Sequence, residues 1–170
     1  MLDTLQNFAE VSVAIMGFSG IVSTVYIRSE QTWTPRERDH LLSLLQTSAM
    51  VIGFSLLPQV LIPQFGEGYV LWVIANSLYL IVHFAHYVTI ARKMKRALAA
   101  NKSYAIGRRN AYASGVIATA LICCQMLAIL FGSIDQMHFV YLLILLWHTA
   151  CAIAMFCALL IRVTPTIKHQ

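Results

Sequence analysis

Charged residues are scarce in this chain. Asp, Glu, Lys and Arg make up only 11% of its 170 residues, whereas apolar residues make up 59%. A soluble domain of this length needs far more charge to cover its surface. The composition therefore excludes an ordinary water-soluble domain, and it favours a single domain, residues 1–170, with lipid as its main solvent.

Catalytic and metal-binding motifs are also missing. The sequence has no HExxH, no glycine-rich phosphate loop, no paired carboxylates and no Ser-His-Asp arrangement, so we predict no catalytic residues, no metal site and no enzyme. Its cysteines lie in apolar stretches without CxxC spacing. We expect buried, reduced thiols that act as small apolar side chains at Cys123, Cys124, Cys151 and Cys157.

Long apolar runs dominate what is present. A membrane-spanning helix needs about 20 mainly apolar residues. Five segments qualify, at about residues 8–27, 41–62, 69–91, 111–131 and 137–161. The predicted fold is all-α, a polytopic bundle of five transmembrane helices. No Lys or Arg precedes the first run and no small-residue cleavage site follows it, so we expect the first helix to remain in the mature protein.

The joints between these runs carry helix-start and turn signals. Thr34, Pro35 and Glu37 match an N-cap, a first-turn proline and a capping-box glutamate. Ser133 with Gln136 is a second capping-box candidate, which would open the last helix. Residues 63–68 (PQFGEG) predict a tight turn between the second and third helices.

The cationic residues are segregated. All 12 Lys and Arg fall after the first, third and fifth spans, and none falls in the N-terminal segment or in the two short turns. Cytoplasmic loops are enriched in Lys and Arg. The pattern predicts a membrane protein with its N-terminus outside the cytoplasm and its C-terminus inside.

The loop after the third span is the most basic segment. Its position between apolar runs argues against nucleic-acid binding, although the net charge is +5. We expect it to fix orientation and to attract anionic lipid headgroups; docking of an acidic cytosolic partner is the alternative. The candidate basic patch consists of Arg92, Lys93, Lys95, Arg96, Arg108 and Arg109.

The third span is amphipathic. At 100° per residue its polar residues fall within an arc of roughly 100°, so this stripe should face other helices or a wet cavity. The plainer interpretation is hydrogen bonding between helices. The alternative is a polar path that moves protons or cations through a small channel or transporter. That path would comprise Glu10, Gln46, Asn76, Tyr79, His83, His86 and His148.

The first span carries Glu10, Val13, Gly17, Gly20 and Thr24 on one stripe. Small residues allow a second helix to approach closely, so the stripe predicts a helix-packing face. Glu10 lies near the outer end of the span, where it either reaches water or is protonated. The leading functional hypothesis follows: a non-enzymatic membrane component that forms a homo-oligomer or accompanies a membrane partner.

A third function is left open by two histidines. His83 and His148 lie at similar predicted depths on different helices, about 21 Å and about 16 Å from the outer ends of their spans. Such a pair could ligate haem b in a redox protein. No second histidine pair supports the site.

Part of the sequence is similar to known proteins. Residues 8–11 (FAEV), 17–22 (GFSGIV), 33–38 (WTPRER) and 55–58 (SLLP) resemble short, uncharacterised bacterial inner-membrane proteins. The resemblance covers roughly residues 8–58. It implies an inner-membrane location and brings no activity, substrate or cofactor.

Overall fold

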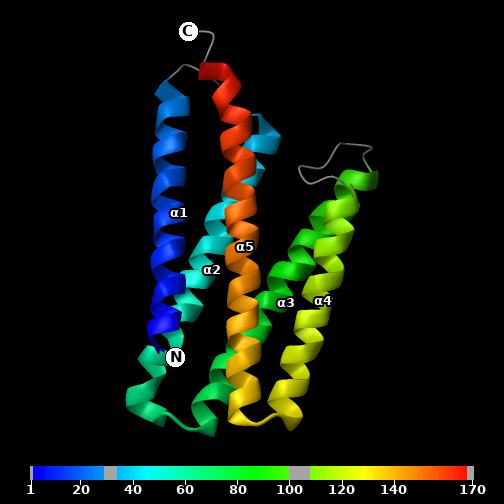
Figure 1. Cartoon of the computed structure of the whole chain (residues 1–170). Helices are drawn as coiled ribbons and strands as arrows, with labels where there is room; N and C mark the ends of the chain where they lie inside the picture. The colour runs from blue at the N-terminus through cyan, green and yellow to red at the C-terminus, as the bar shows by residue number, and fades with distance from the viewer. Residues whose placement is uncertain (1, 29–33, 100–107, 168–170) are drawn as a thin grey trace. The chain divides into compact units, whose positions relative to one another are not determined.

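A computed structural model describes residues 2–28, 34–99 and 108–167. These residues form five α-helices and no strand, and Figure 1 follows them in order. The all-α prediction is confirmed. The helices are α1 (Leu2–Arg28), α2 (Pro35–Phe65), α3 (Tyr69–Ala99), α4 (Arg108–Phe131) and α5 (Ile134–Ile167).

All five helices are long and apolar enough to cross a membrane. The candidate spans are Leu2–Thr24, Glu37–Phe65, Tyr69–Lys93, Tyr112–Phe131 and Ile134–Ile161. Each overlaps a span expected from the sequence, so the prediction of a five-helix, multi-pass membrane protein is confirmed. The helix α1 begins six residues before the expected span, at Leu2 rather than near Phe8.

Large apolar side chains cover the outside of the helices. Phe131 is 82% exposed, Ile161 is 72% exposed and Val116 is 70% exposed. Water would penalise such a surface at about 25 cal/mol per Å² of apolar area, whereas acyl chains solvate it. The surface is therefore built for lipid.

The cysteines correct one expectation. All four thiols are free, as predicted, but Cys123, Cys124 and Cys157 are exposed and Cys151 is only half-buried. The expectation of burial comes from water-soluble proteins, in which a small apolar side chain avoids the surface. In lipid the surface is itself apolar, so a thiol can lie there without cost.

Both predicted capping boxes form. At the start of α2, the Thr34 amide donates to Glu37 Oε2 at 2.9 Å and the Glu37 amide donates to Thr34 Oγ1 at 3.3 Å. At the start of α5, Ser133 and Gln136 make the same reciprocal pair, at 2.9 and 3.3 Å. These bonds satisfy amides that lack partners within the helix, and they fix where each helix begins.

The predicted turn at residues 63–68 is shorter than expected. The helix α2 continues through Pro63 to Phe65, and only residues 66–68 lie between α2 and α3. Gly66 has a φ of +67° and its amide donates to the carbonyl of Ile62 at 2.8 Å. A glycine in this left-handed conformation terminates a helix readily, because it has no Cβ to clash.

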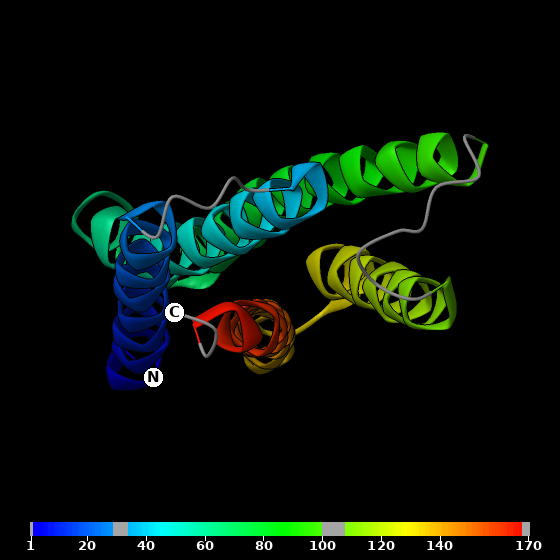
Figure 2. The same ribbon diagram turned by 90° about the horizontal axis from the view of Figure 1, so that it is seen from above.

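The chain forms two compact units, which we describe separately. The terminal unit contains residues up to Leu56 and from Leu145 onward, so it includes α1, most of α2 and the later part of α5. Its core joins these helices through Ile15, Leu44, Ala152 and Leu159. Figure 2 shows the three helical segments seen from above.

The central unit contains Leu57–Ile144, with the end of α2, all of α3 and α4, and the start of α5. The helix α3 packs along α4. In Figure 1 the α2–α3 and α4–α5 turns of this unit lie at the same end, at the bottom of the view. The far end of α3, which holds the basic residues, lies opposite these turns.

Candidate functional site

The central unit holds a group of polar and aromatic side chains, which we call the amide–aromatic cluster. All of them are buried except His138, which is half-buried. Three helices contribute to it. Its members are Trp72, Asn76 and Tyr79 of α3, Gln125 of α4, and His138 and Tyr141 of α5. The expectation that the polar stripe of the third span faces other helices is met at these α3 positions, which are all buried.

Two amide side chains form the polar part of the cluster. Gln125 Nε2 donates to the backbone carbonyl of Asn76 at 3.1 Å and lies 3.5 Å from Asn76 Oδ1. Asn76 Nδ2 donates to the Trp72 carbonyl at 2.9 Å and lies 3.5 Å from the Met137 carbonyl. These bonds join α3 to α4 and to α5. Gln125 Oε1 is buried and has no hydrogen-bond partner among the described residues.

Four rings form the aromatic part. The Trp72 ring lies 4.2 Å from His138 and 5.6 Å from Tyr141, in both cases edge-to-face. Tyr141 also meets Tyr79 edge-to-face, with ring centroids 5.3 Å apart. Edge-to-face pairs at these distances contribute about 0.5–1.5 kcal/mol beyond area burial. The cluster therefore stabilises the packing of α3 against α5.

The predicted polar residues further along α3 are more varied. His83 is buried, and its ring centroid lies 6.3 Å from that of Tyr79. His86, one turn further on, is half-buried. Beside it, Thr119 of α4 donates to the Tyr87 hydroxyl at 3.1 Å. The burial of the α3 stripe thus decreases from the cluster toward the basic end of the helix.

The other members of the predicted path lie elsewhere. Glu10 and Gln46 are exposed, on α1 and α2 of the terminal unit. His148 is buried in that unit, on α5. The structure brings together Asn76, Tyr79 and His83. The pairing of His83 with His148 as haem ligands stays a prediction, and a Soret band in the absorption spectrum of the purified protein would support it.

Three polar residues escaped the sequence analysis. Gln125, His138 and His40 were not among the predicted site residues. In the terminal unit, His40 of α2 is buried, and its Nε2 lies 3.0 Å from the Met155 carbonyl of α5, a contact that joins these helices. A polar side chain within an apolar run is itself a signal for such a bond, because lipid cannot satisfy it.

The first helix carries the second candidate surface. Because α1 begins at Leu2, the predicted packing face extends further toward the N-terminus. The residues on this extended face are separated by alternating steps of three and four positions. This set, the α1 stripe, is Asp3, Gln6, Glu10, Val13, Gly17, Gly20 and Thr24. All seven residues are exposed, whereas Leu5, Ala9, Ser12, Ile15 and Ser19 of the same helix are buried.

Geometry within the α1 stripe suits a close helix contact. No atom of the described chain outside α1 lies within 4 Å of where a Cβ would stand on Gly17 or Gly20. The Thr24 hydroxyl donates to the Gly20 carbonyl at 2.9 Å, so its polarity is satisfied within the helix. Toward the N-terminus, Gln6 Nε2 donates to Glu10 Oε1 at 2.9 Å. The α1 stripe is therefore polar in its N-terminal half, and in its C-terminal half the two glycines leave a surface without large side chains.

The basic patch is only partly visible. Arg92, Lys93, Lys95 and Arg96 are exposed on the last turns of α3, which continues to Ala99. Arg108 and Arg109 begin α4, and their side chains lie outside the described set. Among the described residues, no group of three or more His, Cys, Asp or Glu side chains is placed to hold a metal ion.

No family model, curated protein or solved structure matches this chain. The residues themselves therefore carry the functional argument.

Proposed function

We propose that this protein is a non-enzymatic component of the bacterial inner membrane that binds another transmembrane helix through the α1 stripe. The first partner to consider is a second copy of the chain. The resemblance of residues 8–58 to short inner-membrane proteins supports the location. The segregation of Lys and Arg supports a periplasmic N-terminus and a cytoplasmic C-terminus.

One observation carries the proposal: an exposed Gln6–Glu10 hydrogen bond lies within an apolar span, Leu2–Thr24. Because this span begins at Leu2, Glu10 lies eight residues, about 12 Å, inside it and not near its outer end. An ionisable side chain at the bilayer centre costs at least about 2.5–3.5 kcal/mol. The second oxygen of the Glu10 carboxyl makes no hydrogen bond to a described residue, and lipid offers it none. A partner helix would supply donors and would shield the pair from acyl chains.

The spacing of the α1 stripe fits this use. Residues that recur every 3.5 positions form a continuous seam between two helices that cross at about +20°. Gly17 and Gly20 lie in this seam and leave room for a second backbone. Two copies that pair through the seam would bring Gln6 and Glu10 of each chain close to those of the other.

Cysteine crosslinking tests the proposal with a matched pair of positions. Val13 and Val11 are both exposed, at 55% and 43%, but they lie about 160° apart around α1 and only Val13 is on the stripe. In a variant without the native cysteines, an oxidant should link Val13→Cys chains into dimers and leave Val11→Cys chains monomeric. Adding Gly17→Leu and Gly20→Leu should abolish the Val13 crosslink.

Two results would contradict self-association. Equal crosslinking at Val11 and Val13 would indicate random encounters, and no crosslinking at either would exclude a pair formed by the stripe. A Val13 adduct of different mass, found only in native membranes and lost with Gly17→Leu, would assign the stripe to another membrane protein.

A proton or cation pathway is the second candidate. The buried rings of the central unit favour it, because His83 follows Tyr79, the last α3 member of the amide–aromatic cluster, along the helix. Histidine exchanges protons near neutral pH. Liposomes that contain the purified protein should then show a proton flux that His83→Ala and His148→Ala reduce. An unchanged flux in the double variant would remove this candidate.

A further inference from the structure

Four cations cluster at the end of α3, and none of them pairs with an acid among the residues that the structure describes. Arg92, Lys93, Lys95 and Arg96 lie within five residues, and their side chains are exposed. None of them makes an ion pair with a carboxylate in the described ranges of the chain. The described part of the chain therefore leaves the charge of this cluster unneutralised.

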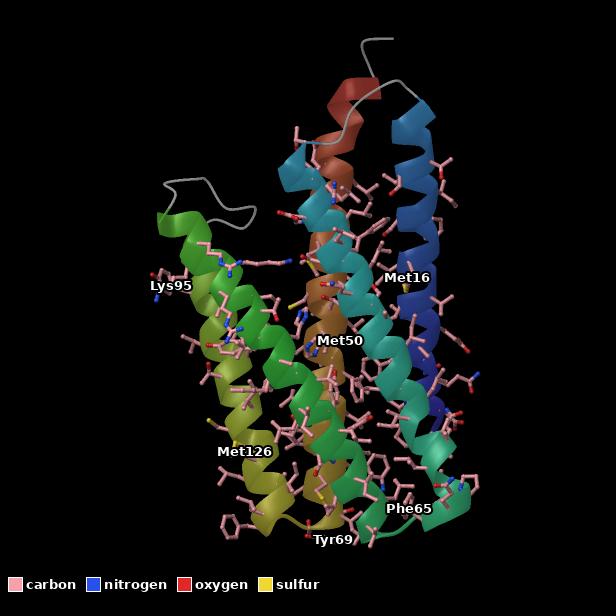
Figure 3. The ribbon with its side chains drawn as sticks, turned by 180° about the vertical axis from the view of Figure 1, so that it is seen from behind. Met16, Met50, Phe65, Tyr69, Lys95 and Met126 are labelled. Atoms are coloured by element: carbon pink, nitrogen blue, oxygen red, sulfur yellow. The ribbon has the colours of Figure 1, made fainter. Side chains whose placement is uncertain are left out.

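The described acids of the central unit are distant from this end. Glu67 lies in the α2–α3 turn and Asp135 opens α5, both at the other end of the unit. Figure 3 labels Lys95 and Tyr69 near opposite ends of α3. Lys95 comes 26 positions after Tyr69, which corresponds to about 39 Å of helix. That distance is several Debye lengths at physiological salt, so these acids do not offset the basic end.

The same face of α3 carries apolar side chains about two to four turns before Arg92. At 100° per residue, Arg92, Lys95 and Arg96 fall within an arc of about 100°. Leu78 and Ile81 fall within that arc, and Phe84 lies about 20° outside it; all three are large exposed side chains. The candidate span ends at Lys93, which places the cations at the depth of the headgroups.

We propose that this face of α3 is a binding surface for anionic phospholipid. The acyl chains would lie along Leu78 and Ile81, and the phosphate would meet Arg92, Lys95 and Arg96. A phospholipid matches both parts of the face, the apolar length and the basic end. An acidic protein would match the cations alone, and a narrow acidic segment would not reach charges spread over such an arc.

The test uses the full-length protein in a neutral detergent. Its thermal unfolding midpoint is followed during titration with phosphatidylglycerol, phosphatidylcholine or inorganic phosphate. One variant, Arg92→Gln/Lys95→Gln/Arg96→Gln, removes the proposed contacts. Its matched control, Arg28→Gln/Arg36→Gln/Arg38→Gln, removes the same charge from the region between the first two spans, outside the basic patch.

Phosphatidylglycerol should raise the midpoint of the wild type and of the control, and the other two additives should not. Removal of the three α3 cations should weaken phosphatidylglycerol binding on the order of 100-fold. High salt should weaken wild-type binding, because headgroup attraction is screened. If the triple variant does not fold, Lys95→Gln alone should still weaken binding measurably.

Four results would overturn the proposal. An equal loss in the control variant would show that only net charge matters. An equal effect of phosphatidylcholine would indicate general solvation by lipid, and an equal effect of phosphate would indicate a soluble anion. Displacement of phosphatidylglycerol by an equimolar acidic peptide would assign the surface to a protein partner.

Discussion

The Asn76–Gln125 pair offers a quantitative test of how the helices of the central unit are joined. Gln125 Nε2 lies 3.1 Å from the backbone carbonyl of Asn76 but 3.5 Å from its side-chain oxygen. The second distance is at the outer limit for an N–H···O hydrogen bond. The amide of Gln125 therefore binds mainly a backbone atom, which remains when the Asn76 side chain is removed.

Two magnitudes follow from this geometry. Hydrogen bonds between transmembrane helices contribute about 0.6 kcal/mol on average and at most about 1.7 kcal/mol. Gln125→Ala should cost about 2–3 kcal/mol, because it removes such a bond and leaves a cavity. The coupling free energy between Asn76→Ala and Gln125→Ala should stay below about 0.5 kcal/mol, because the two side chains barely interact.

Gln125→Leu should differ sharply from Gln125→Ala. Leucine fills the same volume and removes Gln125 Oε1, a buried acceptor without a partner among the described residues. Burial of such an atom costs about 1–3 kcal/mol, which offsets the lost hydrogen bond. The leucine variant should therefore lie within about 1 kcal/mol of the wild type.

Reversible unfolding in mixed micelles, followed by far-UV circular dichroism, gives the free energy of unfolding of each variant. The double-mutant cycle uses Asn76→Ala, Gln125→Ala and their combination, and Gln125→Leu is the matched control. A coupling above about 1.5 kcal/mol would show that the side chains are the principal contact. A leucine variant as unstable as the alanine variant would show that Gln125 Oε1 has a partner, and either result would refute the reasoning.

Two further predictions use the same unfolding assay. Gly66→Ala should lower the free energy of unfolding by about 1–2 kcal/mol, because φ at this residue is +67°. Gly68→Ala should cost much less, because nothing lies within 4 Å of its new Cβ. Equal costs would contradict the role of the left-handed turn. Tyr141→Ala should cost about 3–5 kcal/mol of stability, because the buried ring packs on Trp72 and Tyr79. Tyr141→Phe keeps those contacts and should cost at most about 1.5 kcal/mol. Similar costs for both variants would show that the hydroxyl, and not the ring, supplies the stability.

The number of helices was predictable from the sequence, and so were the starts of α2 and α5, which the capping boxes mark. A run of about 20 apolar residues is a strong signal, because a bilayer imposes that length on a helix. Reciprocal side-chain bonds such as Thr34–Glu37 depend only on residues three positions apart, so the sequence contains them fully. The start of α1 was predicted too late. The polar residues before Phe8 mark where the apolar run begins, but the helix itself begins earlier.

Lateral contacts were not predictable. Helical periodicity shows that Asn76 and Tyr79 share a face, but it does not show which helix lies opposite. The partner of Gln125 depends on α4 packing against α3, which no local pattern specifies. His138 was overlooked because it lies next to the expected start of the fifth span, where a polar side chain needs no special explanation.

The α1 stripe shows both sides of this limit. Periodicity identified Glu10, Gly17 and Gly20 as one face, and the structure leaves that face exposed in the isolated chain. A packing face without a partner in its own chain is what self-association requires, but periodicity alone cannot separate a contact within the chain from one between chains.

The central claim is that lipid solvates these helices, with the short turns on one side of the membrane and the basic segments on the other. Labelling of single cysteines by a membrane-impermeant maleimide tests it directly, in intact spheroplasts that carry a variant without native cysteines. Glu67→Cys, in the α2–α3 turn, should react from outside, and Lys102→Cys should react only after the membrane is opened. Reaction of both positions in intact spheroplasts, or of neither, would contradict the account.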